Sequence, residues 1–297
     1  MSSTTFTRPT PAPPVPRNQW SRASRRRKLT WIADHSLAIG FAVIFMAPFV
    51  FIFLQSMMSS SQALTGQLWP RSWHPSNYLE VFKQAPTLRY LWNTLLYASL
   101  STIFMLISSV PAAYALARFR FKGRQFAFLV VLMMMMLPPQ VTQVPIYIMW
   151  TKLHLTGTLW PLILPNLLGD AFSIFLLRQF MLTIPEEYSE AARVDGAKEW
   201  QILLKVIVPM AKPGIVATAM FSFFFAWNDF YGPLLYTSEN QSNWTISLGL
   251  ASFRNLYQVQ WNLTMAATIL AMLPVLVLFF FAQKAFVEGV TLTGIKG

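Results

Sequence analysis

Long apolar stretches alternate with shorter polar segments along most of the chain. Six such stretches lie at about 37–58, 91–117, 125–149, 158–182, 211–236 and 262–287. Each is close to the roughly 20 residues that an α-helix needs to cross the hydrocarbon core of a bilayer. Hydrophobic residues occupy 55% of the 297 positions, more than a soluble core of this size could bury. The pattern therefore predicts an all-α integral membrane protein whose transmembrane domain, residues 31–297, has six transmembrane helices.

Residues 1–30 form a polar segment before the first apolar stretch. Five prolines between positions 9 and 16, and a basic run that ends at Lys28, favour an extended, unfolded chain. A basic run before an apolar segment is also typical of a secretory signal. The stretch at 37–58 is too long for a signal, however, and no small-residue cleavage site follows it. We predict a disordered Pro-rich basic cytoplasmic tail, whose role the pattern does not indicate, and a retained first helix.

Positive charge is distributed unevenly about these spans. Only five of the 23 Lys and Arg residues fall in the alternate polar segments: Arg71, Lys83, Arg89, Lys152 and Arg254. The others lie in the tail, in 118–124, in 178–212 and near the C-terminus. Because loops rich in Lys and Arg stay cytoplasmic, both termini are predicted to be inside. Topology and anionic lipid then explain the net charge of +12, and no nucleic-acid partner is needed.

Several function classes are disfavoured by what the sequence lacks. There are no cysteines, and the three histidines, His35, His74 and His154, form no ligand-spaced pair, so we expect no metal site. A chain that hydrolyses ATP needs a G-x-x-x-x-G-K-[ST] loop before a helix. Gly289 and Gly294 have that spacing, but Ile295 follows and no helix comes after it. We expect no catalytic residue and no cofactor in this chain, which is not predicted to be an enzyme.

Two segments on the predicted outer side, 59–90 and 237–261, are long and polar and contain several tryptophans. Segments of this size could form a docking surface for an external partner. In the first, Ser76 is placed to cap a short helix over Asn77–Phe82.

Prolines inside the apolar stretches, among them Pro111, Pro138, Pro139 and Pro274, predict bent helices. Bent helices suit a protein that encloses a cavity.

The most informative polar segment lies between the fourth and fifth spans, at about 184–209. Thr183 can cap a helix that has Pro185 in its first turn, and Glu190 can pair with Arg193 three residues later. Gly196 can adopt a positive φ, so the first helix should end there. A second amphipathic helix should run from about Lys198 to Val206 and stop at Pro209. The prediction is a cytoplasmic helix-turn-helix segment.

This segment resembles the EAA loop of the membrane subunits of ATP-binding-cassette (ABC) importers. The residues that match are Glu190, Ala191, Ala192, Arg193, Asp195, Gly196, Ala197 and Pro209. Val206 and Val208 stand where that family often has Ile and Leu, which is a mild departure. The resemblance implies that these residues couple the permease to a separate ATPase. We refer to residues 184–209 as the EAA segment.

Other residues narrow the resemblance to the maltose-type, carbohydrate-importing branch, and there to its six-span second permease subunit. They are Asn77-Tyr78, Trp227-Asn228-Asp229 and the C-terminal Gly289-x4-Gly294-Ile295-Lys296-Gly297. The resemblance implies a bacterial cytoplasmic (inner) membrane location and a sugar or polyol cargo. It also implies three kinds of partner: a second permease subunit in a heterodimer, an ATPase dimer that uses ATP and Mg, and an extracytoplasmic solute-binding protein.

Five residues in the spans are candidates for a translocation path: Asn166, Asp170, Trp227, Asn228 and Asp229. A carboxylate inside a membrane is costly and usually faces protein or water. Asn166 and Asp170 are four residues apart and would share one helix face, and Trp227 could stack on a sugar. The alternative is that these groups make hydrogen bonds between helices, or that Asp229 lies near the outer boundary.

Two rival functions stay open at this point. In an ion-coupled secondary transporter, Asp170 or Asp229 would carry the proton or cation and no ATPase would be needed. In an ABC importer of glycerol phosphate or another small organic solute, a phosphorylated cargo would need basic residues facing the path. None of the predicted spans has one at mid-depth, which favours a neutral sugar.

Overall fold

The computed structural model describes residues 17–253 and 260–294, and within them every regular element is helical. This confirms the all-α prediction. The chain divides into two compact units, Met1–Ile52 and Phe53–Gly297, which we describe separately.

The described residues of the first unit lie in one helix, α1 (Arg17–Ser56), whose last four residues belong to the second unit. Its part from Thr30 to Ser56 is long and apolar enough to cross a membrane. The helix begins at Arg17, so the prediction of an unfolded chain up to residue 30 is wrong for residues 17–30, while residues 1–16 lie outside the described residues. Arg and Lys are good helix formers, and extending an existing helix toward its N-terminus costs little.

The second unit opens with two short helices, η1 (Gln62–Leu64) and α2 (Ser76–Gln84). Helix α2 confirms the short helix predicted over Asn77–Phe82. Ser76 is not its cap, because it is the first helical residue and follows Pro75 without a side-chain cap. Asn77 instead fixes the helix: its Nδ2 donates to the carbonyls of Ser56 and Met58, both at 2.8 Å.

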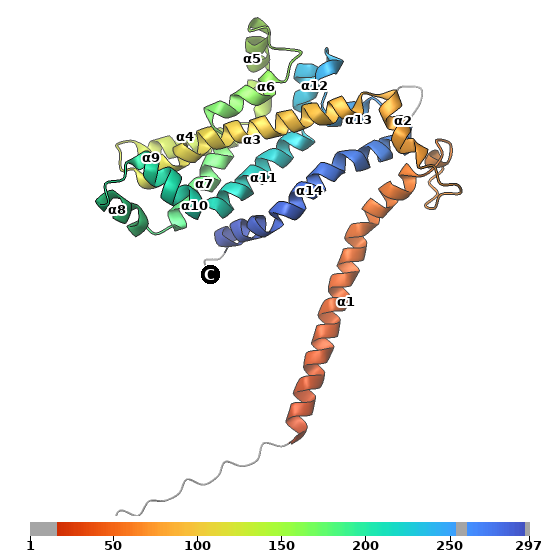
Figure 1. Cartoon of the computed structure of the whole chain (residues 1–297), viewed down its shortest axis with the longest axis horizontal. Coiled ribbons are helices and arrows are strands. Elements are labelled where there is room, and N and C mark those ends of the chain that lie inside the picture. Colours follow the sequence, from red (N-terminus) through yellow and green to blue (C-terminus); the bar gives the residue numbers. More distant parts are fainter. Residues whose placement is uncertain (1–16, 254–259, 295–297) are drawn as a thin grey trace, which may run out of the picture. The chain divides into compact units, whose positions relative to one another are not determined.

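Helix α3, Thr87–Arg118, lies at the centre of the second unit (Figure 1). It packs against α7 (Ala171–Thr183) and α11 (Lys212–Asn228), and α14 (Trp261–Gly294) packs against α11 and α2. Helices α3 and α14 continue through Pro111 and Pro274 and cover the apolar stretches at 91–117 and 262–287, each of which was predicted to form one helix. Along the chain, the EAA segment connects α7 to α11, and both of these helices pack against α3.

The other three predicted spans are interrupted. The stretch at 125–149 forms α4 (Arg124–Met136) and α5 (Pro139–Lys152), which meet at 92°. The residue before a proline avoids the helical region, and here Leu137 and Pro138 are both extended. The stretch at 158–182 forms α6, η2 and α7, and that at 211–236 forms α11 and α12. The bounds of these shorter elements are Trp160–Ile163 for α6, Leu164–Leu168 for η2 and Tyr231–Thr237 for α12.

The lengths of the helices allow the number of membrane crossings predicted from the sequence. Among the described residues, four helices are long and apolar enough to span a membrane, or up to six if each bent helix pair is one span. The six-span prediction lies within this range. The inside location of both termini stays a prediction. Beyond α12 the chain adds η4 (Gln241–Asn243) and α13 (Ile246–Ala251) before α14.

Candidate functional site

The first helix of the EAA segment is α8, Glu187–Val194, which is reached from α7 through the extended residue Ile184. Thr183 does not cap it, because Thr183 is the last residue of α7 and its hydroxyl donates to the Phe180 carbonyl at 2.7 Å. The prediction of that cap is therefore wrong. Glu187 and Glu190 lie in the first turn of α8, where negative charge offsets the positive end of the helix dipole.

Gly196 ends α8 as predicted, and the turn has a defined hydrogen-bond pattern. The φ of Gly196 is 80°, in the left-handed region that favours glycine. The amide of Gly196 donates to the Arg193 carbonyl at 3.0 Å, and the amide of Ala197 donates to the Ala192 carbonyl at 2.9 Å. These two bonds form a Schellman motif, which satisfies the last carbonyls of the helix. The turn fixes the direction in which the chain leaves α8.

The second half of the segment is a continuous helical stretch of three parts. They are α9 (Glu199–Ile202), the π-helix η3 (Leu203–Ile207) and α10 (Val208–Met210). Pro209 was predicted to stop this helical stretch, but the stretch continues past it to Met210. Pro209 is the second residue of α10 and directly follows the π-helical turn η3. The break comes after Met210, where the direction changes by 81° into α11.

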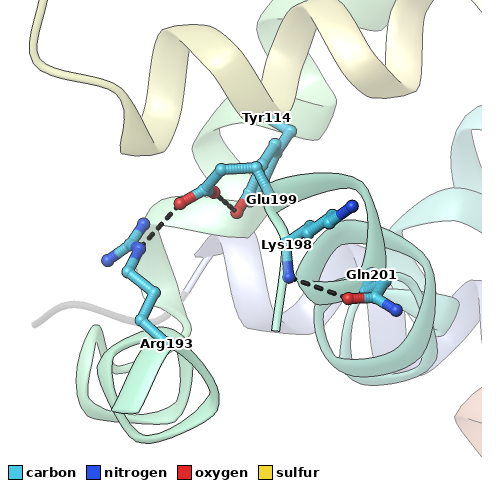
Figure 2. A network of polar contacts seen from close by, with 5 residues as sticks. All are labelled: Tyr114, Arg193, Lys198, Glu199 and Gln201. Atoms are coloured by element: carbon cyan, nitrogen blue, oxygen red, sulfur yellow. Dashed lines mark hydrogen bonds and ion pairs between the residues drawn. The ribbon is translucent and has the colours of Figure 1, made fainter. Parts of the chain in front are cut away.

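A carboxylate ties the two halves of the segment together (Figure 2). Arg193 was predicted to pair with Glu190. Its Nε instead donates to Glu199 Oε1 at 2.7 Å. The other oxygen, Oε2, accepts a hydrogen bond from the Tyr114 hydroxyl on α3, also at 2.7 Å. Arg193, which makes the hydrogen bond and carries the opposite charge, lowers the pKa of Glu199 in this predicted cytoplasmic segment. Glu199 is therefore ionised at neutral pH.

The predicted coupling residues divide into an exposed group and an anchored group. Glu190, Ala191, Asp195 and Gly196 are exposed. Ala192 and Ala197 pack instead against a core cluster that contains the fully buried Ile202 and Ile207. Of the two neighbouring alanines Ala191 and Ala192, only Ala191 is therefore placed to contact a partner. The anchored residues hold α8 on the protein, and the exposed residues are available for contact.

Tyr114 and Glu199 were not among the residues predicted from the sequence. Arg193 and Glu199 are six residues apart, a spacing that no single helix would bring together. The turn at Gly196 folds α9 back against α8, which the predicted helix-turn-helix could have suggested. Tyr114 lies 85 positions from Glu199, and no local pattern signals that contact.

The polar residues predicted for a path mostly have partners within the protein. Asn166 lies in η2, where its Nδ2 donates to the carbonyls of Leu162 and Ile163 at 3.0 and 3.1 Å. Asp170 is the N-cap of α7 and accepts a bond from the Ser173 amide at 2.7 Å. Asn166 and Asp170 were predicted to share one helix face. They do not, because the helix is interrupted between them at Gly169, whose φ is 95°.

Replacing Asp170 with alanine is expected to lower stability by about 1 kcal/mol, the usual cost of losing an N-cap side chain. Asp170→Asn keeps an acceptor for the Ser173 amide and should leave stability nearly unchanged. The midpoint temperature of the monodisperse peak in detergent measures the difference. If Asn proved as destabilising as Ala, the negative charge of Asp170 would matter and its role would go beyond capping.

The three candidates at the end of α11 are also engaged locally. Trp227 is 4% exposed, and its Nε1 donates to the Ala271 carbonyl at 3.2 Å, so it is not available to stack on a sugar in this structure. Asp229 accepts bonds from the Tyr97 hydroxyl at 2.9 Å and the Gly232 amide at 3.0 Å. Asn228 is exposed and donates to the Phe224 carbonyl. Asn228 is thus the most accessible of the three, and a path role for these residues stays a prediction.

Within the described part of the chain, no group of three His, Asp or Glu side chains is placed to hold a metal ion. The main feature of the site is a helix, a glycine turn and a second helix, which lie between two predicted spans of an all-helical bundle. This arrangement is the one expected of a membrane transport permease from the resemblance of the segment to an EAA loop.

Comparison with known proteins identifies the family. The sequence profile described as "Binding-protein-dependent transport system inner membrane component" matches residues 109–292, which include the whole EAA segment. The chain belongs to this family. It is a permease of an ABC importer, a transport protein rather than an enzyme, as the EAA resemblance predicted.

Several curated relatives cover most of the chain. One is the arabinooligosaccharides transport system permease protein AraQ of Halalkalibacterium halodurans, 31% identical over 92% of this chain and 100% of the relative. Another is the lactose transport system permease protein LacG of Rhizobium radiobacter, 31% identical over 89% and 96% of the two chains. A third is the diacetylchitobiose uptake system permease protein DasC of Streptomyces coelicolor, 34% identical over 76% and 83%.

The fold has a solved counterpart. A chain in the crystal structure of a bacterial ABC transporter involved in the import of the acidic polysaccharide alginate superposes with a TM-score of 0.75. The two are 24% identical, and the match covers 88% of this chain and 98% of the other. This likeness supports the helical arrangement described above.

Proposed function

We propose that this chain is one of two different permease subunits of a bacterial sugar importer in the cytoplasmic membrane. An external binding protein delivers the sugar, and a pair of ATPase subunits, which use ATP and Mg, drives the transport. The observation that supports this proposal is the exposed face of α8. This face lies beside the Gly196 turn, and the helix packs on a buried cluster through Ala192. Among the described residues, this surface combines exposed EAA residues with alanines packed against the buried core.

The choice of cargo rests on the relatives and on the contacts that two arginines make among the described residues. The relatives are named for arabinooligosaccharides, lactose and diacetylchitobiose, all of which are carbohydrates. Two arginines near the ends of their spans, Arg118 and Arg178, donate to main-chain carbonyls of neighbouring helices rather than facing a path. A neutral sugar therefore fits better than a phosphorylated solute. These three sugars are the first probes for uptake.

Docking of the ATPase is expected to depend on Glu190. Its carboxylate is exposed in the first turn of α8 and is available to a basic group of the ATPase. Reversing its charge with Glu190→Arg should reduce the ATPase recovered with the permease about tenfold, because a like charge at a docking surface is repelled. The measurement is co-purification after gentle solubilisation, with the masses of the bound subunits determined.

Glu239→Arg is the matched control, since Glu239 is also exposed but lies far along the chain from α8, in the predicted outer segment. This variant should retain the ATPase fully. If Glu190→Arg retained it as well, α8 would not be the docking surface. If the wild-type chain brought down neither a second permease nor an ATPase, the proposal itself would be wrong.

A further inference from the structure

The end of α3 at Arg118 is fastened to the beginning of the EAA segment. Arg118 is 9% exposed, and its Nη2 donates to the carbonyls of Met181 and Ile184 at 2.9 and 2.6 Å. Met181 belongs to the last turn of α7 and Ile184 caps it, and carbonyls at a helix C-terminus have no partner within the helix. A buried guanidinium thus fixes the point at which the chain leaves α7 for α8.

The fastening between α3 and α7 is reciprocal. Arg178 on α7 donates from its Nε to the carbonyl of Leu116 on α3 at 3.1 Å. Its guanidinium carbon lies 3.9 Å from the ring centroid of Phe128, a cation–π contact that holds the side chain in place. Each helix therefore supplies a cation to the last carbonyls of the other. The base of the EAA segment is therefore joined to the end of α3 by hydrogen bonds from both helices.

A second fastening lies one turn earlier on α3. Tyr114 is 2% exposed, and its hydroxyl reaches out of the core to Glu199 at the start of α9. The same carboxylate holds Arg193 on the last turn of α8 (Figure 2). Glu199 thus receives one donor from α3 and one from α8. The side chains of Arg193 and Glu199 are 36% and 43% exposed, so the buried Tyr114 hydroxyl is the fixed end of this chain of contacts.

Helix α3 also reaches the far end of the second unit. Asn93, in its first turns, donates from Nδ2 to the carbonyls of Ser242 and Trp244 at 2.8 and 2.9 Å. These carbonyls belong to the segment between α12 and α13 that is predicted to face outside. A displacement of α8 that is passed to α3 would therefore be felt at the opposite end of the bundle.

We infer that Glu199 and Tyr114 are positioning residues for coupling: the Tyr114 hydroxyl holds the Glu199 carboxylate, which orients Arg193 and so sets the angle of α8 relative to α3. This inference rests on the proposed function only in naming the ATPase as the source of the force. Without the contact, α8 stays attached through the Schellman turn and its alanine anchors, but its angle to α3 is no longer fixed. A push on α8 is then absorbed by rotation of α8 instead of reaching α3.

The first test measures coupling in the complete importer, assembled from the full chain and the partners that co-purify with it. The quantity is the ratio of ATP hydrolysis with the external binding protein to hydrolysis without it. Tyr114→Phe and Glu199→Gln should each lower this ratio about tenfold, the lower end of the scale of one lost charge-assisted hydrogen bond. The double variant should be no worse than the more affected single variant, because both changes break the same chain of contacts.

Thr102→Val is the matched control. It removes a hydroxyl from the same helix, one that donates to the Ala98 carbonyl within α3 at 2.7 Å and lies away from both the EAA segment and the predicted outer segments, and it should leave the ratio unchanged. A purely structural role of Tyr114 would lower the yield of the complex and leave the ratio intact in the complex that forms.

The second test reads the angle directly and needs no ATPase. Because the chain has no cysteine, single cysteines at Ile107 on α3 and Val194 on α8 can carry spin labels, and both side chains are exposed, at 60% and 88%. The distance distribution between the labels should be narrow in the otherwise unchanged chain and should broaden in Tyr114→Phe and in Glu199→Gln. An unchanged ratio together with an unchanged distribution would overturn the inference. A failure of the unaltered importer to respond to ATP would instead refute the proposed function, while the label distances would still decide on the contact.

Discussion

Replacing Gly214 with alanine is expected to push α7 and α11 apart and to cost about 2–3 kcal/mol, at the upper end of what overpacking a core usually costs. A β-carbon at Gly214 would lie 2.5 Å from Cγ of Phe180 and 2.7 and 2.9 Å from its two Cδ atoms. Rotation of the ring about χ2 leaves Cγ in place, and a change of χ1 would have to move the buried ring into other core side chains. Phe180 is 4% exposed and belongs to the core cluster that anchors the EAA segment.

The effect should be visible as a lower midpoint temperature of the monodisperse peak and as weaker retention of the ATPase. Gly40→Ala is the matched control: no atom lies within 4 Å of its added β-carbon, and alanine is the better helix former, so stability should stay equal or rise slightly. Combining Gly214→Ala with Phe180→Leu should recover part of the loss by removing the ring. If Gly214→Ala behaved like Gly40→Ala, the close packing of α7 on α11 would not exist in the membrane.

The EAA segment was predictable because its information is local. The end of α8 at Gly196 follows from one residue that can adopt a positive φ, and the structure places the end of the helix within two residues of it. The helices on either side follow from the spacing of apolar and polar residues. Similarly, α3 and α14 were predicted well because an apolar stretch of sufficient length, without Gly–Asp or Pro–Pro breaks, has little choice but to be one helix.

The interruptions of the other spans could not be placed from hydropathy, which reports the length of an apolar stretch and not its direction. Pro138 and Pro139 were recognised as a bend, but the 92° turn that they produce depends on the neighbours of α4 and α5. Asp170 carried a local signal that was overlooked. A glycine followed by an aspartate, with a serine three residues later, is a pattern for a helix start, and it explains this acid without invoking a path.

The contacts that mount the EAA segment on the bundle are tertiary and leave no trace in sequence spacing. Arg118 was counted as a topology signal, and its charge gave no hint that it would be 9% exposed against two carbonyls. Arg193 was predicted to pair with Glu190, three residues away, but it pairs with Glu199. The Glu199 carboxylate is also held by a buried hydroxyl and so is already ordered before Arg193 binds, which lowers the entropy lost on pairing.

Replacing Gly196 with valine is expected to abolish uptake of the probe sugars while leaving membrane insertion intact. No atom lies within 4 Å of a β-carbon at this position, so the change creates no clash and should not disturb the bundle. The cost is in the backbone: an L-residue in the left-handed region loses roughly 1–2 kcal/mol, and a β-branched one fits there least well. The turn is expected to relieve this strain by giving up the bond from the Ala197 amide to the Ala192 carbonyl.

The loss of that bond would free Ala197 from the core cluster and let α9 change its angle to α8, so that the exposed face of α8 no longer presents Glu190 in its present direction. Gly196→Asn separates this explanation from a simple requirement for a small residue, since asparagine is larger than alanine but tolerates a positive φ. Asn should therefore retain more uptake than Ala, and Val should retain least. An order that followed side-chain size instead would mean that Gly196 is needed for close approach of a partner and not for the turn.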